Sequence, residues 1–122
     1  MWSIENKIVN GLFFKQTCAI APEQYDVFLD EKYVAYVRCR NGKLSVNPIE
    51  KGIDIIIPNV INISDCDFET FEDRYNMYEH TLFNKNIYSK EWPDDKYKSD
   101  IPKEEFEKIS VAIYNHLKVA NI

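Results

Sequence analysis

Hydrophobic and polar residues alternate along three neighbouring segments within residues 24–47. The segments read Q-Y-D-V-F-L-D, Y-V-A-Y-V-R-C-R and K-L-S-V-N, with E-K after the first and N-G after the second. A period of two is typical of β-strands that bury one face. Asn41 and Gly42 favour a tight hairpin because both residue types accept positive φ. With a looser turn at D-E-K, the pattern predicts a three-stranded antiparallel meander.

The alternation assigns the side chains of this meander to two faces. The face expected in the core is apolar and consists of Tyr25, Val27, Leu29, Tyr33, Ala35, Val37, Cys39, Leu44 and Val46. The other face is expected to meet solvent and carries Asp26, Phe28, Tyr36, Arg38, Arg40, Lys43 and Ser45. It is either an ordinary solvated face, with Asp26 pairing with Arg38 across strands, or a contact surface, because aromatic residues and arginines are enriched at binding sites.

The segments on either side of the meander predict further strands. Residues 7–15 read K-I-V-N-G-L-F-F-K, which we interpret as one strand kinked at Gly11 in preference to two short strands. Residues 53–63 are rich in β-branched types but contain Pro58, so they predict two short strands, or one edge strand and an extended crossing. The expected sheet therefore has four to six strands between about residues 8 and 63.

After residue 64 the hydrophobic period changes to three and four. The stripe Phe68, Phe71, Tyr75, Tyr78 and Leu82 predicts a helix over about 66–83 that packs on the sheet, and a cofactor slot or a partner groove is the less favoured interpretation. A second helix is predicted over about 101–120, with Pro102 in its first turn and Phe106, Ile109, Ile113 and Leu117 on its buried side. The chain is thus predicted to be a single α+β domain in which two C-terminal helices cover one face of an antiparallel sheet.

Residues 84–99 are polar and contain Pro93, so they predict a long loop between the two helices. Tyr88 and Trp92 are among its expected anchors. Long loops without regular structure are uncommon in compact domains and often carry function. We therefore include this loop in the predicted contact surface.

Composition limits the kinds of partner. The chain has 122 residues, a hydrophobic fraction of 45% and a net charge of -5, which favours a folded acidic globule. An acidic protein is a poor match for the nucleic-acid backbone, so direct nucleic-acid binding is not expected. The acidic excess lies in residues 62–122, where it favours solubility over recognition of a basic partner.

The cysteines favour a reduced compartment. Cys18, Cys39 and Cys66 cannot all pair, and no C-x-x-C spacing is present. No apolar run reaches the roughly 20 residues of a membrane span, so we expect a cytoplasmic protein without a membrane partner. His80 and His116 show no ligand spacing with the thiols, and no metal or cofactor is expected.

Catalytic motifs are not found. The three glycines are isolated, which removes the phosphate-binding loops. Cys18 is the one candidate nucleophile, but its T-C-A-I-A context is apolar and raises a thiol pKa, so a structural role is preferred. We assign no catalytic residue, and thiol chemistry at Cys18 is the weakest functional alternative.

The segment from Gly11 to Phe28 and the strand after it resemble a known group of proteins. A K-Q-x-C-x-x-x-P-E-Q-Y-D-V-F run precedes a turn and a Y-x-R-x-R-x-G strand, and residues 11–46 resemble small uncharacterised proteins of phages, prophages and other mobile elements of Gram-positive bacteria. The resemblance implies no activity. It marks Lys15, Gln16, Cys18, Pro22, Glu23, Gln24, Tyr25, Asp26, Arg38 and Arg40.

Together these features predict a non-enzymatic binding protein that occupies the surface of a host protein, with inhibition of a bacterial defence system as its expected role. The predicted binding residues are Asp26, Phe28, Tyr36, Arg38 and Arg40 on the polar face, Tyr88 and Trp92 in the loop, and Lys15. The alternative is capture of a small anionic ligand such as a nucleotide, by the cations and a stacking aromatic ring. A homodimer through strands at 53–63 is an open alternative for assembly.

Overall fold

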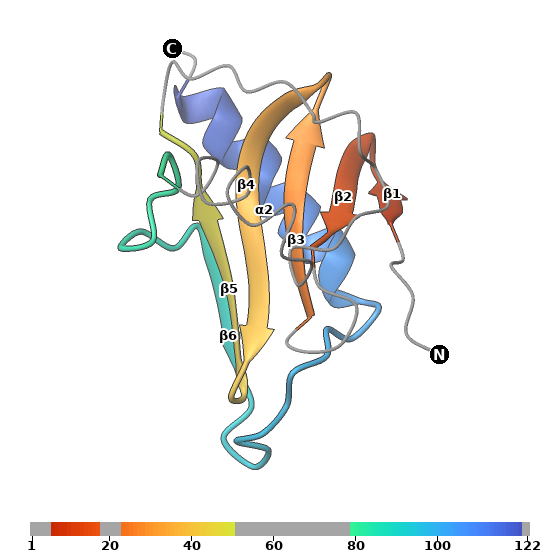
Figure 1. Cartoon of the computed structure of the whole chain (residues 1–122), viewed down its shortest axis with the longest axis vertical. Coiled ribbons are helices and arrows are strands. Elements are labelled where there is room, and N and C mark those ends of the chain that lie inside the picture. The colour runs from red at the N-terminus through yellow and green to blue at the C-terminus, as the bar shows by residue number, and fades with distance from the viewer. Residues whose placement is uncertain (1–5, 18–22, 51–78, 121–122) are drawn as a thin grey trace, which may run out of the picture.

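The computed structural model of the chain describes residues 6–17, 23–50 and 79–120, and it shows an antiparallel sheet with a helix behind it (Figure 1). The strands are β1 (Lys7–Val9), β2 (Leu12–Gln16), β3 (Glu23–Leu29), β4 (Lys32–Arg40), β5 (Lys43–Pro48) and β6 (Tyr88–Glu91), and the helix is α2 (Glu105–Ala120). The six strands follow one another in chain order, and each is antiparallel to its neighbours. The predicted α+β class with an antiparallel sheet is therefore confirmed.

Two-residue turns connect β1 to β2, β3 to β4 and β4 to β5. The φ angles are 51° and 85° at residues 10–11, 50° and 69° at residues 30–31, and 54° and 75° at residues 41–42. Positive φ at both central residues reverses the chain with the twist that a hairpin needs. Residues 10–11 are Asn-Gly, so they close a hairpin between β1 and β2, and the predicted single kinked strand was wrong.

The apolar face of the meander forms the main core beneath α2. Tyr25, Val27, Val37, Leu44 and Val46 are at most 1% exposed. They pack with residues from α2 and the segment before it, namely Ile101, Phe106, Ile109 and Ile113. The predicted buried side of the last helix is thus confirmed, although Leu117 is only partly buried.

A β-bulge changes the face of one predicted core residue. Val27 lies opposite Ala35, but Phe28 lies opposite Tyr33, so β4 contains one extra residue at this point. An extra residue inverts the inward and outward alternation beyond it. Tyr33 consequently packs with Phe28 and Ile49 on the opposite side of the sheet from α2, and its predicted place in the α2 core was wrong.

The region between the two predicted helices contains a strand. Residues 88–91 pair with β5, with Val46 opposite Tyr88 and Lys43 opposite Glu91. The prediction of an unstructured loop over 84–99 was therefore wrong in its centre. Y-S-K-E has a single large apolar residue, so strand formation there depends on the neighbour that β5 provides.

The limits of the predicted helices also change. Helix α2 begins at Glu105, four residues later than predicted. The residues before it form turns, in which the Glu105 N–H donates to the Pro102 carbonyl at 3.0 Å. At the end of the predicted 66–83 helix, Thr81 forms a bridge with Ile49 and residues 79–83 are not helical. The rest of that predicted helix, and the strands predicted at 53–63, lie outside the described residues.

Candidate binding surfaces

Half of the eight predicted binding residues are buried. Lys15, Asp26, Phe28 and Tyr36 are 2%, 0%, 1% and 4% exposed, so the expectation that they meet solvent was wrong. Internal hydrogen bonds help to hold the polar groups. The Tyr33 hydroxyl donates to Asp26 Oδ1 at 2.8 Å, and the Tyr36 hydroxyl donates to Gln24 Oε1 at 3.2 Å.

The register separates the predicted Asp26–Arg38 pair. Asp26 lies opposite Tyr36, and Arg38 lies opposite Gln24 on one side and Ser45 on the other. Alternation along a strand does not determine which residues become neighbours across the sheet, because register depends on the turns and bulges. Arg38 is therefore not neutralised by direct cross-strand pairing with a carboxylate.

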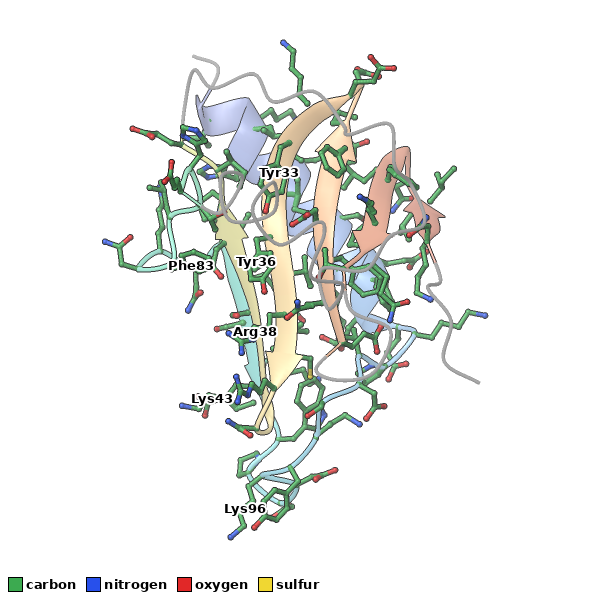
Figure 2. All side chains as sticks on the ribbon, viewed as in Figure 1. Tyr33, Tyr36, Arg38, Lys43, Phe83 and Lys96 are labelled. Carbon is green, nitrogen blue, oxygen red and sulfur yellow. The ribbon has the colours of Figure 1, made fainter. Side chains whose placement is uncertain are left out.

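The same face is open toward the β4–β5 turn. Figure 2 shows Tyr33, Tyr36, Arg38 and Lys43 in a row that leads from the covered part of this face to the turn. Arg38 is half-buried, whereas Arg40 and Lys43 are exposed. We call Arg38, Arg40 and Lys43 the basic end of the sheet.

The cations of the basic end are only weakly paired. The Lys43 ammonium lies 3.9 Å from Glu91 Oε1, and both side chains are about two-thirds exposed or more. An exposed ion pair of this kind contributes at most about 1 kcal/mol. The buried Nε of Arg38 has no hydrogen-bond partner in the described part of the chain. The basic end thus keeps a positive charge that is available to a partner.

The two predicted loop residues lie on the opposite face of the sheet. Tyr88 and Trp92 are partly buried and pack against the core beneath α2. Lys90 and Lys98 lie 5.7 and 5.4 Å from the centre of the Trp92 ring. The structure therefore divides the predicted site between two faces and leaves only Arg38 and Arg40 together on an accessible one.

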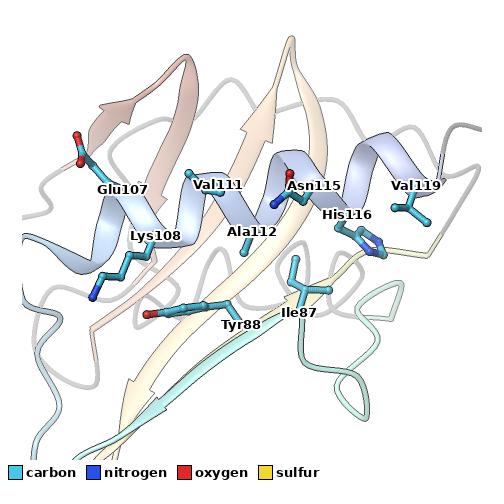
Figure 3. A pocket seen from close by; sticks show the side chains of 9 residues that line it. All are labelled: Ile87, Tyr88, Glu107, Lys108, Val111, Ala112, Asn115, His116 and Val119. Atoms are coloured by element: carbon cyan, nitrogen blue, oxygen red, sulfur yellow. The ribbon is translucent and has the colours of Figure 1, made fainter.

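A groove of about 740 Å³ lies between α2 and the start of β6 (Figure 3). Its lining is mostly apolar and includes Ile87, Tyr88, Val111, Ala112, His116 and Val119. Val111 and Val119 are 55% and 72% exposed. Sequence reasoning missed this groove, although two valines outside the buried stripe of a predicted helix are a usable signal.

A carboxylate is buried at one end of the groove. Glu105 is 1% exposed, and its Oε1 accepts a 2.6 Å hydrogen bond from the Tyr88 hydroxyl. Its Oε2 lies 3.4 Å from the Lys108 ammonium and 3.5 Å from the Lys90 ammonium. Burial opposes ionisation, but the hydrogen bonds and the two lysines outweigh it and lower the pKa of Glu105. Burial and the adjacent carboxylate raise the pKa of Tyr88 to about 12, so its hydroxyl remains a donor.

The lowered pKa of Glu105 predicts acid sensitivity. A carboxylate with a lower pKa in the folded state stabilises the fold fully above the unfolded pKa of about 4.3. That stabilisation is lost as the pH falls through the folded-state value. In urea denaturation, we expect the stability of Glu105→Gln to decrease less than that of the wild type as the pH falls below 5. The exposed Glu104→Gln is the control, and equal acid dependence of both variants would contradict this role for Glu105.

Two other titratable groups have shifted pKa values. Burial raises the pKa of the Cys39 thiol to about 11, with contributions from Glu23 and Asp100, and the thiol is fully buried. Burial and Lys85 lower the pKa of His116. Within the described residues, no group of three His, Cys, Asp or Glu side chains has a metal-binding arrangement. Cys18 lies outside the described residues.

Comparisons with protein-family models, curated proteins and solved structures found no match. Among the described residues, no helix combines the length and apolar composition required for a membrane crossing. The class supported by the fold is a small α+β protein with an antiparallel sheet. Its candidate site consists of two surfaces, the basic end and the groove.

Proposed function

We propose that this protein is a non-enzymatic binding protein that occupies the surface of a host protein, and that the basic end is its contact. The observation that carries the proposal is the position of Arg38, Arg40 and Lys43 together on the open part of one sheet face. They are clustered on a chain whose net charge is -5. A surface rich in carboxylates is the complementary partner, because Arg guanidinium groups bind carboxylates through paired hydrogen bonds.

Rigid strands support the cations of the basic end. Arg40 lies opposite Lys43, and Arg38 lies opposite Ser45, in a continuous ladder between β4 and β5. A side chain on a strand loses less freedom on binding than one on a mobile loop, and pre-organisation of this kind improves affinity. Charge complementarity also accelerates association and makes it dependent on salt.

The small-ligand alternative has less support than the protein-binding proposal. It requires an aromatic ring to stack on a base, but Phe28 and Tyr36 are 1% and 4% exposed. Lys15, its third proposed cation, is 2% exposed. Recognition at the basic end therefore depends on charge and hydrogen bonding, which suits a protein surface with several carboxylates.

The resemblance of residues 11–46 to proteins of phages and other mobile elements adds the biological context. It includes Arg38 and Arg40, the two arginines of the basic end. A mobile element benefits from a small protein that blocks a host protein by covering its surface. We propose a protein of a bacterial defence system in the host cytoplasm as the target.

Charge reversal at the basic end tests this proposal. Immobilised wild-type protein is expected to capture a partner from a Gram-positive lysate. We expect R38E with R40E to weaken that binding at least tenfold, as measured by titration of the purified partner. The double variant K103E with K118E is the control, because it makes the same charge change at exposed lysines elsewhere. Equal loss in both variants, or no loss in the arginine variant, would reject the basic end as the contact.

A further inference from the structure

We propose that the groove between α2 and β6 binds an extended segment of a partner protein, which adds as a strand to the outer edge of β6. This surface lies on the opposite face of the sheet from the basic end, and it does not depend on the function proposed above. The occupant has apolar side chains at alternate positions and acidic residues on either side of them. Three features of the groove lead to this assignment.

The first feature is the open edge of β6. In the part of the chain that the structure describes, β6 is the last strand of the sheet and pairs only with β5. An edge strand presents backbone N–H and C=O groups that another extended segment can pair with. The other edge, β1, has only three residues. The groove lies beside β6, so this is the edge where an added strand would also find a place for its side chains.

The second feature is the apolar wall that α2 presents to this edge. Val111 and Val119 remain largely exposed, and Ile87 and Ala112 extend the apolar surface between them and the strand (Figure 3). From Val111 to Val119 the wall is about 12 Å long at 1.5 Å per residue. A strand covers that length with about four residues at 3.3 Å each, so about two alternate side chains can face α2.

The third feature is the charge at the two ends of the groove. Lys108 and Lys90 lie at the end formed by Tyr88, where they contact Glu105. Lys85 is exposed and lies near the other end, two residues before Ile87, which lines the groove together with His116. Glu107 is on the outer wall, and Glu105 already binds the Tyr88 hydroxyl. Lysines at both ends complement a segment whose apolar centre is flanked by Asp or Glu.

The walls of the groove are held in place without a ligand. Phe106, Ile109 and Ile113 anchor α2 in the core, and the hydrogen bond from Tyr88 to Glu105 joins the helix to β6. A pre-formed site avoids the ordering cost that weakens binding. An extended segment matches both the open edge and the apolar wall, whereas a docked helix would use only the wall.

Selection from a displayed library of random nine-residue peptides tests the proposal on the full chain. We expect the enriched sequences to have apolar residues at alternate positions with flanking Asp or Glu. A synthetic peptide of the enriched sequence should bind the wild type at least tenfold more tightly than the double variant V111E with V119E. I8E is the control for a glutamate introduced at an exposed apolar residue outside the groove, because Ile8 is 77% exposed on the opposite edge strand.

Backbone methylation of that peptide tests strand addition directly. A strand pairs with its neighbour through the backbone groups of alternate residues. N-methylation of one alternate set should therefore abolish binding, while methylation of the other set should leave it within about threefold.

Four results with peptides would overturn the proposal. They are failure to enrich any peptide, apolar residues spaced by three and four as in a helix, binding that survives V111E with V119E, and equal effects of the two methylation patterns. A concentration-dependent dimer of the wild type that V111E with V119E dissociates would assign the groove to a second copy of this chain instead. Both valines are exposed, so we expect each variant to keep its fold. Circular dichroism checks this.

Discussion

Replacement of Gly42 by alanine is expected to lower the free energy of unfolding by about 3 kcal/mol. Gly42 has φ of +75°, which an alanine adopts only with strain. A Cβ at this position would lie 2.7 Å from the Asp95 carbonyl oxygen and 3.1 Å from the Trp92 carbonyl oxygen. These are backbone atoms and cannot rotate away, so the segment after β6 must move. Urea denaturation followed by circular dichroism measures the change.

Gly11 is the matched control for this prediction. It has φ of +85°, so Gly11→Ala carries a similar conformational penalty of about 1–2 kcal/mol. Among the described residues its Cβ would meet only the Tyr114 hydroxyl, at 3.2 Å, which is a side-chain atom that can shift at the expense of its hydrogen bond to the Asn10 carbonyl. Equal losses in the two variants would show that the close approach at Gly42 adds nothing. A larger loss at Gly42 would show that the β4–β5 turn holds residues 92–98.

Phe106→Ala is expected to destabilise the fold by about 3–5 kcal/mol. The ring lies at the start of α2, 5.6 Å from both Phe14 and Tyr25 in edge-to-face contacts. Its removal leaves a cavity where α2 crosses β2 and β3, and the helix loses its first anchor. We expect a lower midpoint in urea and an increase in binding of a hydrophobic dye before unfolding.

Tyr97→Ala is the matched control for Phe106→Ala. Tyr97 is 77% exposed, and its ring contact is with the Lys96 ammonium at 5.3 Å. A surface change of this kind usually alters stability by less than about 0.5 kcal/mol. If Phe106→Ala were no more destabilising than Tyr97→Ala, the aromatic cluster could not be what attaches α2 to the sheet.

Residue types alone predicted the candidate site only in part. The alternation of apolar and polar residues predicted that Arg38 and Arg40 lie on the polar face, and the structure places both on the accessible part of that face. The aromatic partners proposed for them, Phe28 and Tyr36, are buried. The residue pattern of a strand does not distinguish a polar face that meets solvent from one that protein covers, because burial depends on residues distant in the chain.

The groove required information that local patterns do not contain. Tyr88 was predicted as a loop anchor, but its hydrogen bond with Glu105 joins a strand to a helix 17 positions later. Strand β6 has four residues, and most of them are polar. Its sequence is therefore too short and too polar to identify it as a strand without its neighbour. Only the placement of α2 across the sheet brings Val111 and Val119 beside that strand and creates the apolar wall.

The sequence by itself determined the meander, its two main turns, the apolar face under the helix and the buried side of α2. Each of these depends on local chemistry, namely the period of the apolar residues or the short polar turn segments between them. The tertiary structure alone decided the bulge that turns Tyr33 away from the α2 core, the neighbours of Asp26 and Arg38, and the strand at 88–91. These features depend on contacts between segments far apart in the chain, where register and burial are selected by the packing of the whole fold.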